Sequence, residues 1–283
     1  MIQHRTKHLT VFESALFRTT STVLQTDDLI LVVDPTWLPA EIDEIRHHVD
    51  AVRNGKSVYL LFTHSDYDHI LGFGAFQDAC TIASKAFLDN AQKEEQLQAI
   101  HKFDQEYYIR RPYRMVYPRV DLAVDEATDF ITVGDTRLSF WQAPGHNADG
   151  LFTLVEPLGI WIVGDYLSNE EFPFIYHSVS DYAKTLDIAE KIITTRQPKL
   201  MIPGHGDVTS DTREMFLRLK ESRTYLDALR DAAKGGEDQL EDRLWDRYDF
   251  RGVQLEFHRK NLELMRKELE GTMPVVISTE PAD

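Results

Sequence analysis

The sequence His64-Ser65-Asp66-Tyr67-Asp68-His69 directly follows the short apolar run at residues 58–62. This run is β-branched and aromatic, so it predicts a strand, and the polar hexapeptide then forms the loop after that strand. Four of the six side chains are imidazoles or carboxylates, which are common ligands of zinc, iron and other transition metals. Taken alone, the hexapeptide fits either a metal-binding loop or a polar loop that caps a helix beginning near Ile70.

Three further loops also place a side chain that can bind metal after an apolar run, and in each of them a glycine precedes that side chain. They are Gly145-His146 after residues 138–142, Gly164-Asp165 after residues 160–163, and Gly204-His205 after residues 200–202. Glycine lets the backbone turn tightly, and loops at strand ends commonly carry the sites of α/β proteins. The four loops together therefore predict one shared metal site.

The rest of the chain indicates a mixture of strands and helices. Further short apolar runs predict strands at residues 20–25, 29–33, 130–133 and 151–155. Several of these runs are apolar throughout rather than alternating, so we expect helices to cover the outer faces of the sheets. Apolar residues recur at helical spacing within residues 42–52, 182–193, 219–233 and 255–269, which predicts four helices packed on the core.

Residues 86–119 fit this alternation of strands and helices poorly. They begin as a polar helix over residues 89–102 and continue as Tyr107-Tyr108-Ile109-Arg110-Arg111-Pro112-Tyr113-Arg114. This basic and aromatic cluster fits a solvated insertion with a loop. It also fits a lid whose Tyr and Arg side chains meet an anionic or planar group of a substrate.

Composition narrows the class of protein. The chain of 283 residues has 31 Lys and Arg against 47 Asp and Glu, a net charge of −16, which argues against non-specific nucleic-acid binding. Its single cysteine, Cys80, cannot form an intramolecular disulfide, in agreement with a reducing compartment. The first residues lack the apolar core of a signal peptide, and no apolar run approaches the roughly 20 residues that span a bilayer. We expect a cytoplasmic protein that binds a small molecule, and the C-terminal helices could form a homodimer interface.

The four loops, in this order, resemble the metallo-β-lactamase superfamily over roughly residues 10–210. That family has an αβ/βα sandwich, a His-x-His-x-Asp-His signature, two later metal-binding His and one bridging Asp. The resemblance implies an α/β fold, a four-layer αβ/βα sandwich, in a single domain over residues 1–283. The segment at about 86–119 would be an insertion, and residues from about 211 to 272 a helical C-terminal extension.

The resemblance also implies two metal sites. One ion would be held by His64, Asp66 and His146, the other by Asp68, His69 and His205, and both by Asp165. Asp68 would in addition be catalytic, orienting the attacking hydroxide and accepting its proton. We expect two divalent ions, zinc first, with iron or manganese as alternatives.

Asp66 departs from the family pattern, because most members have His at this position. A carboxylate makes the first site harder and more anionic, which moves its preference towards iron or manganese. The flavodiiron branch of the superfamily also carries a carboxylate here, and it performs oxygen or nitric-oxide chemistry.

Three functional hypotheses follow from this pattern. The first is a hydrolase that uses a metal-bound hydroxide to cleave a small ester, thioester, lactone or phosphodiester. The second is a di-iron redox or oxygen-binding protein, and the third is a non-catalytic, metal-stabilised module that binds a partner.

Residues near these loops allow less specific predictions. Tyr166 fits aromatic packing under its loop better than it fits a proton donor to a leaving group. Residues 172–177 fit a pocket wall or an anchor ahead of the next helix, and His177 lies outside the ligand set of the family. We expect His258, like His47 and His48, to face solvent or a neighbouring helix rather than a metal.

Overall fold

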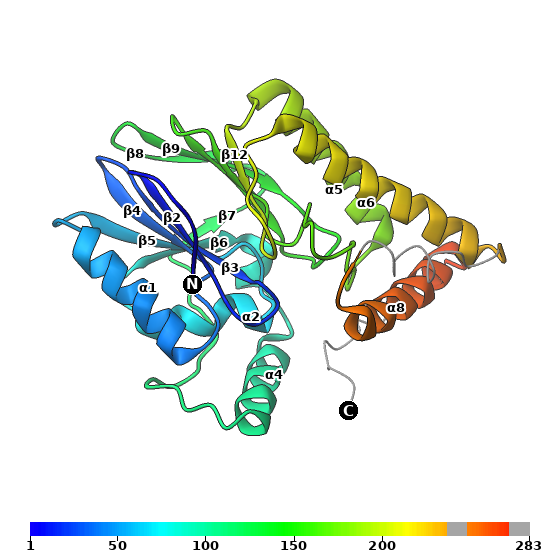
Figure 1. The fold of residues 1–283 in the computed structure, drawn as a ribbon, viewed down its shortest axis with the longest axis horizontal. Helices are drawn as coiled ribbons and strands as arrows, with labels where there is room; N and C mark the ends of the chain where they lie inside the picture. Colours follow the sequence, from blue (N-terminus) through cyan, green and yellow to red (C-terminus); the bar gives the residue numbers. More distant parts are fainter. Residues whose placement is uncertain (237–247, 272–283) are drawn as a thin grey trace.

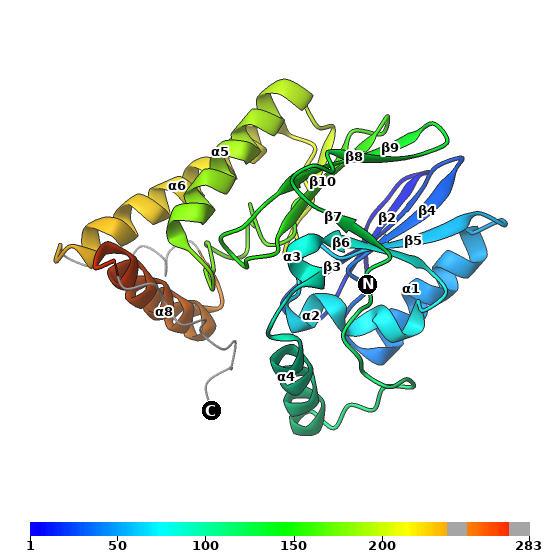
Figure 2. The same cartoon turned by 180° about the vertical axis from the view of Figure 1, so that it is seen from behind.

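The computed structural model describes residues 1–236 and 248–271 of the chain. Two β-sheets lie face to face, and helices cover the outer face of each (Figure 1). The view from behind shows the same order of layers, with α1 on one side and α5 and α6 on the other (Figure 2). The predicted α/β sandwich is therefore confirmed.

The first sheet is built from the first part of the chain. Its seven strands lie side by side in chain order: β1 (Ile2–Arg5), β2 (Leu9–Glu13), β3 (Thr20–Gln25), β4 (Leu29–Val33), β5 (Ser57–Leu61), β6 (Cys80–Ser84) and β7 (Leu122–Val124). Strands β1 to β4 pair antiparallel, whereas β4 to β7 pair parallel. The parallel strands are joined through α1 (Pro39–Val52), α2 (Tyr67–Ile70), the 3₁₀ helix η1 (Leu71–Ala75), α3 (Lys85–Leu88) and α4 (Lys93–Glu106).

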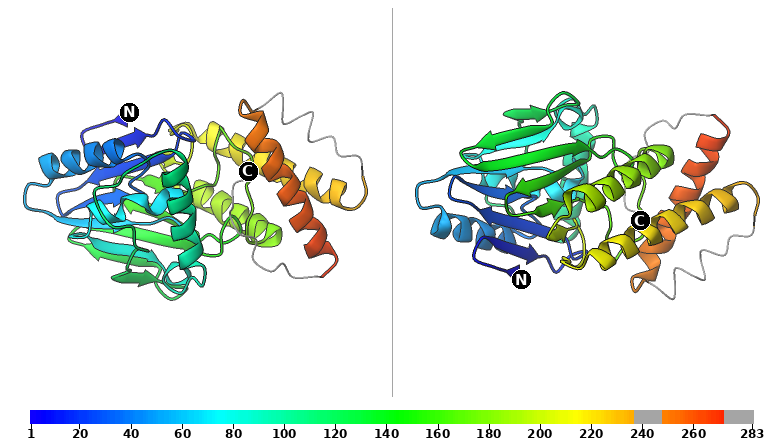
Figure 3. Two further views of the ribbon diagram at one scale, coloured as in Figure 1. Left: turned by 90° about the horizontal axis from the view of Figure 1, so that it is seen from below. Right: turned by 90° about the horizontal axis from the view of Figure 1, so that it is seen from above.

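The second sheet follows in sequence and has five strands. They are β8 (Phe130–Val133), β9 (Thr136–Gln142), β10 (Leu151–Glu156), β11 (Ile160–Ile162) and β12 (Leu200–Ile202), in the spatial order β12-β11-β10-β9-β8. Strands β11 and β12 pair parallel and are connected by α5 (Val179–Arg196). Helix α6 (Thr212–Ala233) packs beside α5, and α8 (Arg251–Leu269) lies across both helices (Figure 3).

Apolar side chains fill the three spaces between these four layers. Strand β4 shows why its sequence is apolar throughout: Leu29 and Leu31 face the second sheet, whereas Ile30 and Val32 belong to the core under α1. A strand buried on both faces has no polar side to expose. The sequence of β4 therefore reports its position in the middle of the sandwich.

The structure corrects several sequence predictions. All eight predicted strands are present, but β1, β2, β6 and β7 were missed, because they are short and their apolar patterns are weak. The helix expected over residues 89–102 is α4 at Lys93–Glu106. It begins later because α3 occupies residues 85–88 and the Asn90 side chain accepts a hydrogen bond from the Gln92 amide in a turn.

Helix α8 buries part of the predicted apolar stripe, including Met265, together with polar residues. Leu269 of that stripe is 46% exposed, whereas Gln254, His258 and Asn261 are buried. The predicted C-terminal extension corresponds to α6 and α8, and its residues 237–247 and 272 lie outside the described part of the chain. Among the helices of residues 1–236 and 248–271, none combines the length and apolar character needed to cross a membrane.

Candidate metal centre

The four predicted loops meet at one edge of the sandwich. In the second sheet, β9 and β11 are both antiparallel to β10, and β12 is parallel to β11, so these three strands end at the same edge. The loop after β5 reaches the same place from the first sheet, because the Leu151 amide donates a hydrogen bond to the Thr63 carbonyl. Sites at the carboxyl ends of strands are the rule in open α/β sheets.

The first group of side chains contains His64, Asp66, His146 and Asp165, each with one possible ligand atom within 4.8 Å of the others. Nε2 of His146 lies 3.1 Å from Oδ2 of Asp66 and 3.4 Å from Oδ2 of Asp165. Nε2 of His64 lies 3.4 Å from the same Asp165 oxygen. Ligands at roughly 2.1 Å from a tetrahedral zinc ion stand about 3.4 Å apart. The spacing of these atoms therefore fits one metal ion between them.

The second group contains Asp68, His69 and His205. Oδ2 of Asp68 lies 3.5 Å from Nε2 of both histidines. Asp165 stands between the two groups, with Oδ1 3.3 Å from Nε2 of His69 and Oδ2 3.3 Å from Nε2 of His205. A side chain at position 204 would exclude this carboxylate, because a Cβ on Gly204 would lie 1.8 Å from Asp165 Oδ1. The structure thus brings all seven predicted ligand residues together.

Hydrogen bonds at Nδ1 aim the histidines inward. Nδ1 of His146 lies 2.7 Å from the Phe174 carbonyl oxygen, and Nδ1 of His205 lies 2.9 Å from that of Phe17. A carbonyl oxygen only accepts, so each Nδ1 carries the proton and each Nε2 keeps a lone pair for a metal.

Asp34, at the end of β4, orients the other two histidines. Its Oδ2 lies 3.1 Å from Nδ1 of His69 and accepts a 2.6 Å hydrogen bond from Thr63 Oγ1. Because the Thr63 hydroxyl donates to Asp34, it accepts from Nδ1 of His64 at 2.9 Å. Sequence reasoning missed Asp34, although the signal was present: it directly follows the strand at residues 29–33, as Asp165 follows its own strand.

Several of the converging atoms have no hydrogen-bond partner. Nε2 of His64, Nε2 of His69 and Oδ1 of Asp165 are buried and unsatisfied. Each such atom costs about 1–3 kcal/mol of stability. Metal coordination would satisfy all three, so these residues fit a pair of divalent ions.

The crowded charges shift the pKa values of the metal-free centre. Burial and the neighbouring His69 lower the pKa of His64, but Asp165 and Asp66 outweigh them and raise it to about 10. Burial would raise the pKa of Asp66, yet the hydrogen bond with His146 and the nearby His64 imidazole hold that pKa well below its usual range. Protons thus balance the carboxylates when no metal is bound, and we expect metal binding to release them.

Asp66 is held in place by a neighbour from the second sheet. Asn147 Nδ2 donates a 2.6 Å hydrogen bond to Asp66 Oδ1, which leaves Oδ2 directed at His146. The carboxylate that replaces the usual His therefore points into the centre as a ligand would.

The sequence matches the family model described as the metallo-beta-lactamase superfamily over residues 15–224. The chain belongs to this superfamily. No curated protein sequence matches it.

Solved structures of this superfamily share the fold at low sequence identity. A metallo-beta-lactamase family protein from Thermus thermophilus has a TM-score of 0.64 at 18% identity, over 94% of this chain and 95% of that one. The stereoselective inverting sec-alkylsulfatase Pisa1 from Pseudomonas sp. has a TM-score of 0.67 at 13% identity, over 94% of this chain and 49% of that one. The BLEG-1 B3 metallo-beta-lactamase has a TM-score of 0.57 at 16% identity, over 74% of this chain and 96% of that one.

Five of the candidate ligands line a cavity of about 290 Å³: Asp66, Asp68, His146, Asp165 and His205. Phe174 and Tyr176 line this cavity, so part of the segment at residues 172–177 forms a pocket wall. Tyr166 instead packs beneath the His146 loop, where its hydroxyl accepts from the His146 amide at 3.0 Å and donates to the Pro144 carbonyl at 2.9 Å. Its expected packing role is the one observed.

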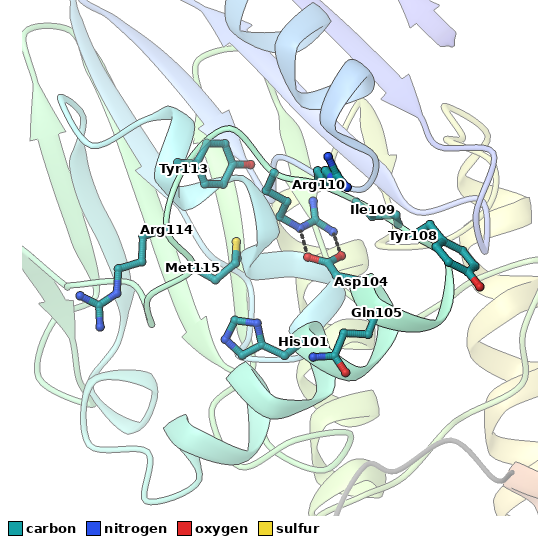
Figure 4. A pocket seen from close by; sticks show the side chains of 10 residues that line it. His101, Asp104, Gln105, Tyr108, Ile109, Arg110, Tyr113, Arg114 and Met115 are labelled. Atoms are coloured by element: carbon teal, nitrogen blue, oxygen red, sulfur yellow. Dashed lines mark hydrogen bonds and ion pairs between the residues drawn. The ribbon is translucent and has the colours of Figure 1, made fainter.

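The basic cluster at residues 107–114 divides between two surfaces. Tyr107 lines the metal cavity. Arg111 faces away from it, with two 2.9 Å bonds to Asp104 and a 2.9 Å bond to the Trp37 carbonyl. Arg110 and Arg114 line a separate shallow pocket with His101 (Figure 4). Of residues 107–114, the cavity is thus lined by Tyr107 and by none of the arginines.

The remaining histidines lie outside the centre, as expected. His258 is fully buried and its Nδ1 lies 3.2 Å from the Tyr225 hydroxyl on α6, so it faces a neighbouring helix. His177 is exposed, and so is His47. His48 packs against Phe12.

Arg18 joins the loops around His205. Its guanidinium pairs with Glu13 at 2.9 Å, with Asp207 at 2.5 Å and with Glu170. The Arg18 carbonyl accepts from the Gly206 amide at 3.0 Å. This network holds the loop that supplies the Phe17 carbonyl to His205.

Proposed function

We propose that the chain is a metal-dependent hydrolase that uses two divalent ions and water to cleave a small ester, thioester, lactone or phosphodiester. One observation carries the proposal: four imidazole Nε2 atoms and three carboxylates converge beside a cavity. Hydrogen bonds at Nδ1 leave those Nε2 atoms free to coordinate.

The proposed division of ligands follows the two groups, with Asp165 shared. When bound, the ions would polarise the scissile group and lower the pKa of a bound water molecule towards neutrality. Zinc is the first choice because imidazole dominates the ligand set, and Asp66 is the reason to test iron and manganese beside it.

Asp68 is the proposed catalytic residue. Its side chain lines the cavity, and its Oδ2 lies 3.5 Å from Nε2 of both His69 and His205. From there it can hold a water molecule against the substrate and accept its proton. The water oxygen bonds to the acyl carbon or phosphorus, the bond to the leaving oxygen or sulfur breaks, and the leaving group departs with the proton.

Replacement of Asp165 tests the proposal, with ester, thioester, lactone and phosphodiester substrates assayed on protein loaded with each metal. We expect Asp165→Ala to abolish turnover and to remove the pairing of the two ions, measured as bound metal per chain. His177→Ala is the control, because His177 lies outside the centre. Turnover that survived Asp165→Ala would show that the site is wrongly assigned.

The same experiment separates the alternatives. Stoichiometric iron with an oxo-bridge absorption band, and no hydrolysis across the panel, would favour the di-iron redox function. Chelation that removed metal but left every measured activity unchanged would favour the binding module. A cytoplasmic location, a homodimer and the lack of nucleic-acid or membrane partners stay predictions.

A further inference from the structure

Aromatic side chains form two walls of the cavity over the metal centre. The wall from the first half of the chain includes Trp37, Tyr67 and Tyr107, and the Trp37 and Tyr67 rings pack edge to face at 5.5 Å. The other wall consists of Phe174, Tyr176 and Phe257 of α8. A cavity of about 290 Å³ between such walls suits a compact group such as one ring.

Phe257 is the centre of the second wall. Its ring stacks on Phe174 at 4.0 Å between centroids and meets Tyr176 at 5.8 Å. Residue 257 lies beyond the match to the superfamily model, which ends at residue 224. The family match therefore says nothing about the helix that carries Phe257.

Three polar side chains fix α8 against the loop after Asp165. Gln254 donates to the Glu170 carbonyl at 2.9 Å, and Asn261 accepts from the Ile175 amide at 3.0 Å. Glu268 accepts from the Val179 amide at 2.7 Å. These residues are spaced seven apart, so they share one face of the helix. The clasp formed by Gln254, Asn261 and Glu268 holds Phe257 at a fixed distance from the metal centre.

The charges of the cavity, apart from the metal ligands, are mostly negative. Glu171 and Glu256 line it, and the one Lys or Arg beside them, Lys260, pairs with Glu256 at 2.6 Å. An anionic group of the substrate would meet the Glu171 carboxyl in this cavity, and the one lysine there is already paired with Glu256.

We propose that the substrate is an uncharged carboxylic ester or thioester whose aromatic or branched apolar group packs between the two walls, with Phe257 setting the size of that group. This inference rests on the proposed function and chooses among its substrates. Water adds its oxygen to the acyl carbon, the bond from that carbon to oxygen or sulfur breaks, and the alcohol or thiol leaves with a proton.

Three p-nitrophenyl esters with one common leaving group test the proposal: the acetate, the phenylacetate and a para-carboxylated phenylacetate. We expect kcat/KM, normalised to alkaline hydrolysis, to be about ten-fold higher for phenylacetate than for acetate. The carboxylated ester should be about ten-fold poorer than phenylacetate, and Glu171→Gln should narrow this difference.

Phe257→Ala should reduce the phenylacetate-to-acetate ratio several-fold at unchanged metal content. Phe250→Ala is the matched control, since Phe250 precedes the same helix, is 58% exposed and does not line the cavity. A ratio that Phe257→Ala left unchanged, or a preference for the carboxylated ester, would overturn the inference.

The failure of this inference differs from the failure of the proposed function. Hydrolysis of a phosphodiester but of no ester would refute only the inference, whereas no hydrolysis of any substrate would refute the proposed function. NMR titration with phenylacetamide and acetamide measures binding in the cavity and so tests the apolar pocket without any turnover. Phenylacetamide should bind more tightly, and Phe257→Ala should remove the difference; equal binding would refute the apolar pocket.

Discussion

Asp34 orients the imidazole rings of two candidate metal-binding histidines. Its carboxylate meets Nδ1 of His69 directly and reaches His64 through the Thr63 hydroxyl. Its backbone has φ +44, a left-handed conformation that Asn tolerates as well as Asp. Asp34→Asn therefore changes the hydrogen bonding with little strain on the chain.

We predict that Asp34→Asn weakens metal binding by roughly 10–100-fold, as is typical when a residue that orients a metal-binding histidine is changed. Asparagine is uncharged and has one acceptor oxygen, whereas the Asp34 carboxylate accepts from the Thr63 amide at Oδ1 and from the Thr63 hydroxyl and His69 at Oδ2. Competition with a metal-binding dye measures the affinity. Asp28→Asn, which alters hydrogen bonds to Asp135 and Thr136 outside the centre, should leave it unchanged. Equal metal affinities of the two variants would show that Asp34 does not orient the histidines for metal binding.

Position 66 sets the preference of the first site among metals. We predict that Asp66→His raises the ratio of zinc to manganese affinity at that site by about ten-fold or more, because imidazole is a softer ligand than carboxylate. The second site, which contains Asp68, His69 and His205, serves as the internal control. Titration of each metal against a chelator gives both ratios, and an unchanged ratio at the first site would contradict the prediction.

The metal-binding residues were more predictable than the residues that orient them. The seven candidates are marked by residue type and by their place after apolar strands, which are local features. Asp34 acts on His69 across 35 residues of chain, and Asn147 acts on Asp66 across 81. Contacts at such separations depend on the packing of two sheets, which no local pattern encodes.

Helix α8 shows, at the scale of one element, where periodicity fails. The apolar stripe within residues 255–269 predicted a core-facing side, and the buried side carries Gln254 and Asn261 as well as Met265. These side chains bond to the backbone of the loop between β11 and α5, which contains no strand or helix. A helix that packs on a loop needs polar groups inside, and hydrophobic periodicity does not report them.

Asn261 should be the most important member of the clasp. It is 1% exposed and bonds to the Ile175 amide, the Pro173 carbonyl and the Tyr225 hydroxyl. We predict that Asn261→Ala lowers the free energy of unfolding by about 3 kcal/mol, because buried partners lose their hydrogen bonds. Urea denaturation measures the change. Gln98→Ala on the exposed side of α4 should have little effect, and equal stability of the two variants would show that the clasp is dispensable.

At the scale of the whole molecule, negatively charged side chains are concentrated around the candidate centre. Asp66, Asp68 and Asp165 lie together in a chain of net charge −16, and Glu171 lines the same cavity. Divalent ions that bind only the folded state stabilise it, by about 2.7 kcal/mol when the free metal is at 100 times its Kd.

We predict that chelation lowers the melting temperature and that zinc, iron or manganese restores it. Magnesium prefers oxygen ligands and should not restore it, because four imidazoles belong to the set. Differential scanning calorimetry at fixed metal concentrations gives the comparison. A melting temperature that did not change with metal would argue against a centre that ties the two sheets together.

The division of the chain between the two sheets has a practical consequence. The first sheet ends with β7 at Val124 and the second begins with β8 at Phe130, so a cut in the exposed turn around Glu126 would separate them completely. His64, Asp66, Asp68 and His69 would stay on one fragment, and His146, Asp165 and His205 on the other. Two separately produced fragments should then associate more tightly when a suitable metal is added, which would make the protein a split reporter of metal ions.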